Sequence, residues 1–92
     1  MGTKPRVKQE RLADKLRDIR LALGLSQAEL CKHLGVEELI AAKQISTYEL
    51  GKREPPLRIL LQYARAANVS TDVLIDDKLD LPDKLPAKPK HR

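Results

Sequence analysis

Glycines at positions 24, 35 and 51 divide most of this chain into short segments, and each follows a run of apolar residues at helical spacing. Because glycine readily adopts the left-handed conformation that ends a helix, we expect helices to stop at these positions. In the first segment the apolar residues recur at spacings of four, three and four: Leu12, Leu16, Ile19 and Leu23. This stripe predicts a helix from about residue 8 to residue 23, ended by Gly24.

The rest of the patterned chain predicts four more short helices. Ser26 and Glu29 have the spacing of a capping box, so a second helix is expected to begin at Ser26 and end near Gly35. The remaining helices are expected over about 37–50, 57–67 and 70–75. The residues expected to face inward are Leu30, Leu34, Ile45, Tyr48, Leu57, Leu60, Leu61 and Ala64, and the last helix carries Val73, Leu74 and Ile75. The predicted fold class is thus all-α, a compact five-helix domain with disordered termini.

Three regions follow from this pattern. Residues 1–7 lack a period and carry basic charge, which predicts a flexible basic arm. Residues 8–77 form the helical domain. Residues 78–92 combine Pro82, Pro86 and Pro89 with alternating charges, which predicts a disordered tail.

Composition narrows the classes of function. The chain has no Phe or Trp and only two Tyr, which argues against proteins that stack single-stranded bases on exposed rings. The chain has a single cysteine, Cys31, so it cannot form an internal disulfide. One cysteine alone also cannot build a zinc site. No apolar run approaches a membrane span, so we expect a cytoplasmic protein that does not contact a membrane. The net charge of +5 mildly favours a polyanionic partner.

Nothing in the sequence indicates an enzyme. The expected ordered core lacks a Ser/His/Asp or Cys/His set, and no glycine-rich phosphate loop is present. We therefore expect no catalytic residues, no cofactor and no metal site.

The second and third predicted helices, joined by a glycine-containing turn, have the pattern of a helix-turn-helix. The run LRDIRLALGLSQAELCKHLGV, followed by ISTYELGKREP and later VSTDVLI, resembles the lambda-repressor-like (Cro/XRE) helix-turn-helix family. The resemblance covers about Leu12 to Ile75. It implies a DNA-binding domain in which the second helix of the helix-turn-helix pair enters the major groove.

The resemblance also implies roles for particular residues. Gln27 begins the second helix, where its amide suits a phosphate oxygen or a base edge, and the small Ala28 allows close approach of the duplex. Gln44 and Thr47 are expected on the outward face of the third helix, with Lys43 on the same side to reach guanine or a phosphate. A Gln amide can bond to adenine and a Thr methyl can contact a thymine methyl, and the sequence does not identify the bases. In the following loop, Lys52 and Arg53 are expected to bind phosphates. Arg20 and Glu49 resemble the family's ion pair, with two possibilities open for Arg20: a structural role alone, or an additional phosphate contact.

The sequence departs from the family between Gly35 and Ile45. Nine residues, 36–44, separate them here, four more than is usual, which is close to one helical turn. The helix-favouring run ELIAAK predicts that this insertion extends the recognition helix to about 37–50. Glu37 and Glu38 would then face phosphates, which leaves three alternatives open. The added turn is canted away from the groove, the acidic pair disfavours binding to wrong sites, or this surface binds protein instead of DNA. Leu39 and Ile40 are expected to cover the core or to meet such a partner.

The expected function is a sequence-specific transcriptional regulator that binds double-stranded DNA as a homodimer on an inverted repeat. The alternative is a protein-interaction module on the same fold, such as an antitoxin or a coactivator-like adaptor.

Overall fold

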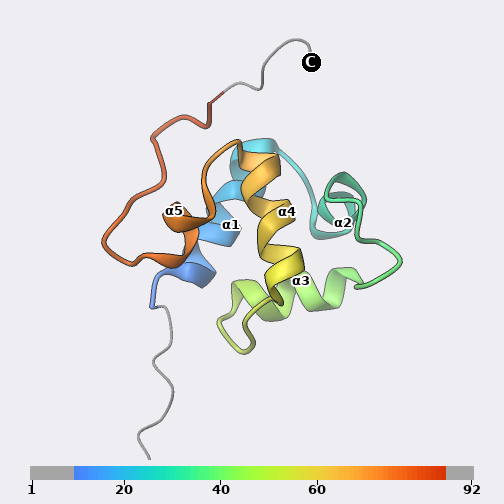
Figure 1. Ribbon diagram of the computed structural model, residues 1–92. Coiled ribbons are helices and arrows are strands. Elements are labelled where there is room, and N and C mark those ends of the chain that lie inside the picture. Colours follow the sequence, from blue (N-terminus) through green and yellow to red (C-terminus); the bar gives the residue numbers. More distant parts are fainter. Residues whose placement is uncertain (1–9, 87–92) are drawn as a thin grey trace, which may run out of the picture.

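The computed structural model describes residues 10–86, and within this range the chain forms five helices and no strand. The helices are α1 (Leu12–Leu23), α2 (Gln27–His33), α3 (Ala42–Glu49), α4 (Leu57–Ala67) and α5 (Thr71–Ile75). Helix α1 packs against α3, α4 and α5, and α2 packs against α3. In Figure 1, α3 runs along the lower edge, and α2 and α5 lie on opposite sides of α4. The expected all-α, five-helix fold is confirmed.

The core is built almost entirely from aliphatic side chains and the two tyrosines. On α1 the predicted stripe is correct at Leu16 and Ile19, which are completely buried. On α4 the prediction was wrong for Leu57 and Leu61, which are 79% and 39% exposed. The prediction was correct for Leu60 and Ala64, which are buried. Together with Ile59, Tyr63 and Ala67 they form the face of α4 that packs against α1 and α5.

Local hydrogen bonds set the junction between α1 and α2. Gly24 ends α1 with a φ of 72°, a left-handed conformation that is costly for residues with a side chain. Ser26, two residues after Gly24, caps the start of α2. The backbone N–H of Glu29 donates to the Ser26 hydroxyl at 3.0 Å, and the Ser26 N–H donates to the Glu29 carboxylate at 2.8 Å. The capping box predicted from sequence is therefore present. These bonds also lower the pKa of Glu29.

The segment between α2 and α3 differs from its prediction. Residues 37–39 form a turn, and α3 begins only at Ala42, so the insertion does not extend the helix. The Ala41 N–H donates to the side-chain oxygen of Gln44 at 3.1 Å, which starts the helix at this point. Val36 is buried, and Ile40 packs against the core. Anchoring of the segment at both sides therefore overrides the helical propensity of its sequence.

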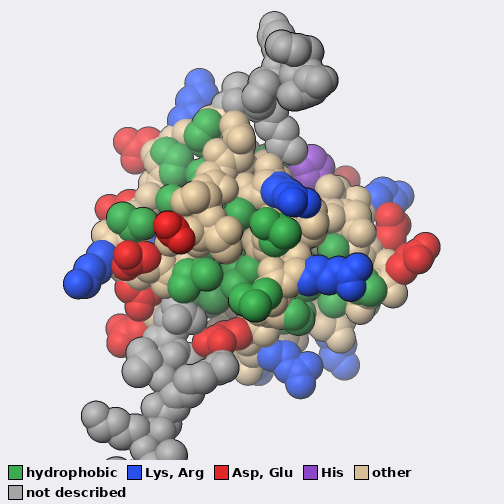
Figure 2. Space-filling model, in the orientation of Figure 1, with side chains coloured by type: hydrophobic (Ala, Val, Ile, Leu, Met, Phe, Trp, Pro, Cys, Tyr) green, Lys and Arg blue, Asp and Glu red, His purple; other side chains and the backbone are tan. Residues whose placement is uncertain are grey.

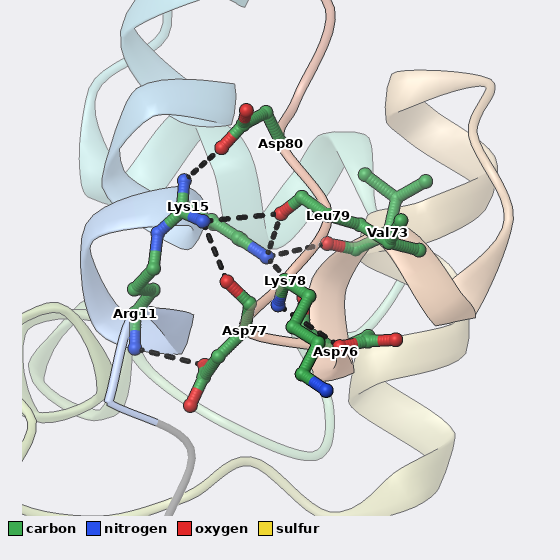
Figure 3. A network of polar contacts seen from close by, with 8 residues as sticks. All are labelled: Arg11, Lys15, Val73, Asp76, Asp77, Lys78, Leu79 and Asp80. Atoms are coloured by element: carbon green, nitrogen blue, oxygen red, sulfur yellow. Dashed lines mark hydrogen bonds and ion pairs between the residues drawn. The ribbon is translucent and has the colours of Figure 1, made fainter.

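A buried lysine joins α1 to the end of α5 (Figure 3). Lys15 is only 3% exposed, and its ammonium group donates to the carbonyl oxygens of Val73 at 2.7 Å, Asp76 at 2.9 Å and Leu79 at 2.7 Å. These carbonyls lie at or beyond the end of α5, where the last turn of a helix leaves acceptors unpaired. Burial is the main cause that lowers the pKa of Lys15, and the nearby charge of Arg11 is the second. The three hydrogen bonds compensate for taking this charge out of water.

The start of α1 is held by the same C-terminal segment. The Asp77 carboxylate accepts the backbone N–H groups of Glu10 at 3.0 Å and Arg11 at 3.1 Å, and these bonds lower its pKa. The Arg11 guanidinium donates to the Asp77 carbonyl at 2.6 Å and forms an ion pair with Asp80. We call the contacts of Arg11 and Lys15 with residues 73–80 the clasp.

The residues that follow the clasp run along the body of the domain. Leu81 and Leu85 are half-buried and pack against the core, where the sequence predicted a disordered tail from residue 78. The prediction rested on the prolines and alternating charges of this segment. Its two anchoring leucines are too few to form a recognisable apolar pattern. The predicted basic arm, 1–7, and residues 87–92 lie outside the described residues.

Candidate nucleic-acid interface

Helices α2 and α3 form a pair that is fixed from beneath by the core. Ile45 is completely buried and Tyr48 is 3% exposed, so these two residues turn the inner face of α3 toward the protein. Leu30 does the same for α2. The opposite sides of the two helices therefore face outward on one part of the surface, which is the arrangement expected of a helix-turn-helix.

An ion pair connects α1 to the end of α3. Arg20 donates to Glu49 through Nε at 2.7 Å and through a terminal nitrogen at 3.0 Å, a bidentate geometry. The two side chains are 15% and 5% exposed. The hydrogen bond to Glu49 raises the pKa of Arg20, and the guanidinium also donates to the Leu25 carbonyl at 3.0 Å. The end of α1, the α1–α2 turn and the end of α3 are thereby held together.

Gln27 belongs to the same group of contacts. Its side-chain amide donates to Glu49 at 3.3 Å, which joins the first residue of α2 to the last residue of α3. Sequence reasoning assigned this amide to DNA, and in the structure it is half-buried and bonded within the protein. The neighbouring Ala28 is exposed. We call Arg20, Gln27 and Glu49 the Glu49 cluster.

The outward residues of α3 are at its first two turns. Lys43 is exposed, and Gln44 and Thr47 are half-buried. Gln44 uses its carbonyl oxygen to accept the Ala41 N–H, which leaves the two protons of its amide group to donate elsewhere. The Thr47 hydroxyl donates to the Lys43 carbonyl at 2.9 Å, so it is left as an acceptor beside the methyl group. The face thus offers an ammonium, an amide donor and a small apolar group.

Two further basic side chains follow α3. Lys52 and Arg53 are both exposed in the loop between α3 and α4. The Lys52 N–H donates to the Thr47 carbonyl at 3.1 Å, which holds the loop close to the end of α3. The loop therefore presents two positive charges next to the outward face of α3.

Sequence reasoning missed the clasp, although a signal for it was present. Lys15 lies three residues after Leu12 and four before Ile19, which places it on the apolar stripe of α1 and not on its flank. A charged residue on such a stripe indicates a buried partner. Its partners are backbone carbonyls, which no residue pattern reveals.

Two other features of the described residues bear on the kind of site. None of the helices in this part of the chain is long and apolar enough to span a bilayer. Across residues 10–86, no group of three or more His, Cys, Asp or Glu side chains is placed to hold a metal ion.

The paired helices, the buried ion pair and the exposed basic loop define a protein of the helix-turn-helix class. The family model described as helix-turn-helix matches residues 16–74, and the chain belongs to this family, of the Cro/C1 type, whose members are DNA-binding regulators. Among solved structures, the chain is similar to the P22 c2 repressor protein, crystallised in complex with the synthetic operator 9T in the presence of Tl+. The two share 29% identity with a TM-score of 0.62, over 72% of this chain and 94% of the repressor chain. No curated protein matches the chain.

Proposed function

We propose that this protein is a transcriptional regulator that recognises specific sequences in double-stranded DNA by inserting α3 into the major groove. The observation that carries the proposal is the outward face of α3, which presents Lys43, Gln44 and Thr47 from a helix pinned by Ile45 and Tyr48. An α-helix fits the major groove, where each base pair shows a distinct pattern of donors and acceptors. The P22 c2 repressor, which has the same fold, was crystallised with an operator. A cytoplasmic location accords with this function.

Base recognition is assigned to the three outward residues of α3. The free amide protons of Gln44 suit the acceptor atoms of adenine or guanine in the major groove, and the Thr47 methyl suits the methyl group of thymine. Lys43, at the first turn, reaches a guanine or a phosphate.

Phosphate binding is assigned to the residues around this helix. Lys52 and Arg53 flank its end, and Ala28 leaves room for the backbone of the duplex next to Gln27. The hydrogen bond from Gln27 to Glu49, at 3.3 Å, is the longest bond in the Glu49 cluster. When this bond breaks, the Gln27 amide is able to donate to a phosphate. Arg20 keeps its bidentate pair with Glu49 and serves mainly to hold the interface together.

Two alanine variants separate these roles. Gln44→Ala is expected to change the preferred sequence, with about 1–3 kcal/mol of discrimination lost at one base pair. Lys52→Ala is expected to weaken binding to all sequences alike and to reduce the salt slope by about one unit. Mobility shifts over a range of salt, with duplexes selected from a random pool, measure both effects.

The structure of the variants needs one control, because Gln44 also accepts the Ala41 N–H. Gln44→Glu keeps that acceptor and removes the amide donors, so it should alter base preference while leaving the helical circular dichroism unchanged. If both Gln44 variants lose affinity equally for all DNA sequences, the assignment of Gln44 to base contacts is wrong. Absence of a salt-sensitive shift for the unchanged protein would overturn the proposed function itself.

We further propose that the protein binds an inverted repeat as a homodimer through the exposed leucines around the start of α4. Leu50, Leu57 and Leu61 are 65%, 79% and 39% exposed, and hydrophobic side chains gather on the face occupied by α4 (Figure 2). Leu50 and Leu57 flank the loop that carries Lys52 and Arg53. A second copy seated there would supply a second α3 helix, as binding to two half-sites about one helical turn apart requires.

Leu57→Glu is expected to abolish this dimer, because it places a charge at the most exposed leucine of the patch. Sedimentation should then show monomers where the unchanged protein forms dimers, and affinity for an inverted repeat should fall at least tenfold, with half-site binding retained. Leu21→Glu is the matched control, since Leu21 is 58% exposed on α1. Equal effects of the two substitutions would argue against this interface.

A further inference from the structure

The loop between α2 and α3, residues 36–41, is held in one conformation. The Val36 N–H donates to the Cys31 carbonyl at 3.0 Å, and the Val36 carbonyl accepts the N–H groups of Leu39 at 2.8 Å and Ile40 at 3.0 Å. Val36 is 3% exposed, and Ile40 packs against the core. A loop with both ends anchored and a closed turn between them presents its tip residues at a defined place beside α3.

The tip of this loop is acidic. Glu37 and Glu38 are exposed, and neither carboxylate forms an ion pair or hydrogen bond with another residue of the range 10–86. Glu38 precedes Ala42 by four residues, so its Cα lies within about 14 Å of the start of α3. The turn shortens that distance further. Two unpaired negative charges are thus placed next to the end of α3 that carries Lys43.

We infer that Glu37 and Glu38 determine the specificity of this interface by repelling DNA phosphates near the start of α3. This inference rests on the proposed function. Free N–H groups make a helix N-terminus attractive to phosphates of any sequence, and the two carboxylates offset that attraction. Contacts to base edges, made by uncharged groups such as the Gln44 amide, are affected far less.

The repulsion acts unequally on matched and mismatched DNA. On a matched site the base contacts hold α3 in one register, and the anchored loop stays at a fixed distance from the phosphates. On mismatched DNA the protein is held by phosphates alone and shifts along the backbone to maximise those contacts. The carboxylates penalise these shifted positions most, so they raise the ratio of specific to non-specific affinity.

The double variant E37Q/E38Q tests this inference. Affinity for a scrambled duplex should rise about tenfold, and affinity for the preferred duplex by only about threefold, at low salt. The slope of log K against log salt on the scrambled duplex should steepen by up to about 1.8. Titrations on both duplexes between about 50 and 200 mM salt measure these quantities.

The matched control is D18N/D83N, which changes the net charge by the same amount. Asp18 and Asp83 are exposed and line a shallow cavity between α1 and the C-terminal segment, and no shift in either affinity greater than about twofold is expected there. An unchanged salt slope in E37Q/E38Q, or an equal rise in affinity for both duplexes, would overturn the inference. Failure of the unchanged protein to bind any duplex would instead overturn the proposed function, so the two failures are distinguishable.

Discussion

Replacing Glu49 with alanine is expected to lower the free energy of unfolding by about 3 kcal/mol. The substitution leaves the Arg20 guanidinium, only 15% exposed, without the carboxylate that accepts its two hydrogen bonds. A buried charge that has lost its partner costs far more than the pair contributes, and the remaining bond of Arg20 to the Leu25 carbonyl compensates for only part of its desolvation. Urea unfolding followed by circular dichroism measures the change.

Two controls separate this effect from the loss of any carboxylate. Glu38→Ala removes an exposed acid and should change the free energy of unfolding by less than about 0.5 kcal/mol. The double variant R20L/E49L removes the charge together with its partner and should recover a large part of the stability lost in Glu49→Ala. If the double variant is less stable than Glu49→Ala, the stranded charge is not the cause.

The second large effect is expected at the clasp. Lys15→Met keeps most of the apolar stem but removes the ammonium group that donates to three carbonyls, so the free energy of unfolding should fall by about 3 kcal/mol. The C-terminal segment should also detach more often. Faster hydrogen exchange at the Leu79 N–H, which is bonded to the Asp76 carbonyl at 3.0 Å, would report this opening.

Lys78→Met is the matched control for this prediction. Lys78 is exposed in the same segment, and only its backbone N–H is bonded, at 2.9 Å to the Asp76 carboxylate. Its removal should change neither stability nor exchange appreciably. Equal stability of the Lys15 and Lys78 variants would show that the clasp contributes little to the folded state.

The local geometry of the candidate interface was partly predictable because it depends on short-range rules. Ser26 and Glu29 are three residues apart, so their capping box sets the start of α2 in any fold that allows a helix there. The exposed positions of Lys52 and Arg53 follow from the loop that Gly51 begins. The internal use of Gln27 and Gln44 was not predictable, because an amide suits a carboxylate or a backbone N–H as well as it suits a base.

Local patterns along the chain were enough to predict the helical class, the helix boundaries at Gly24 and Ser26, and the aliphatic stripe of α1, since spacing and capping act within a few residues. Packing between distant segments decided that Leu57 and Leu61 of α4 stay exposed and that α3 begins at Ala42. It also decided that Lys15 is enclosed by backbone carbonyls beyond α5. The physical reason is the same in each case: burial and hydrogen bonding between segments far apart in the chain outweigh local propensities of a few tenths of a kcal/mol per residue, roughly.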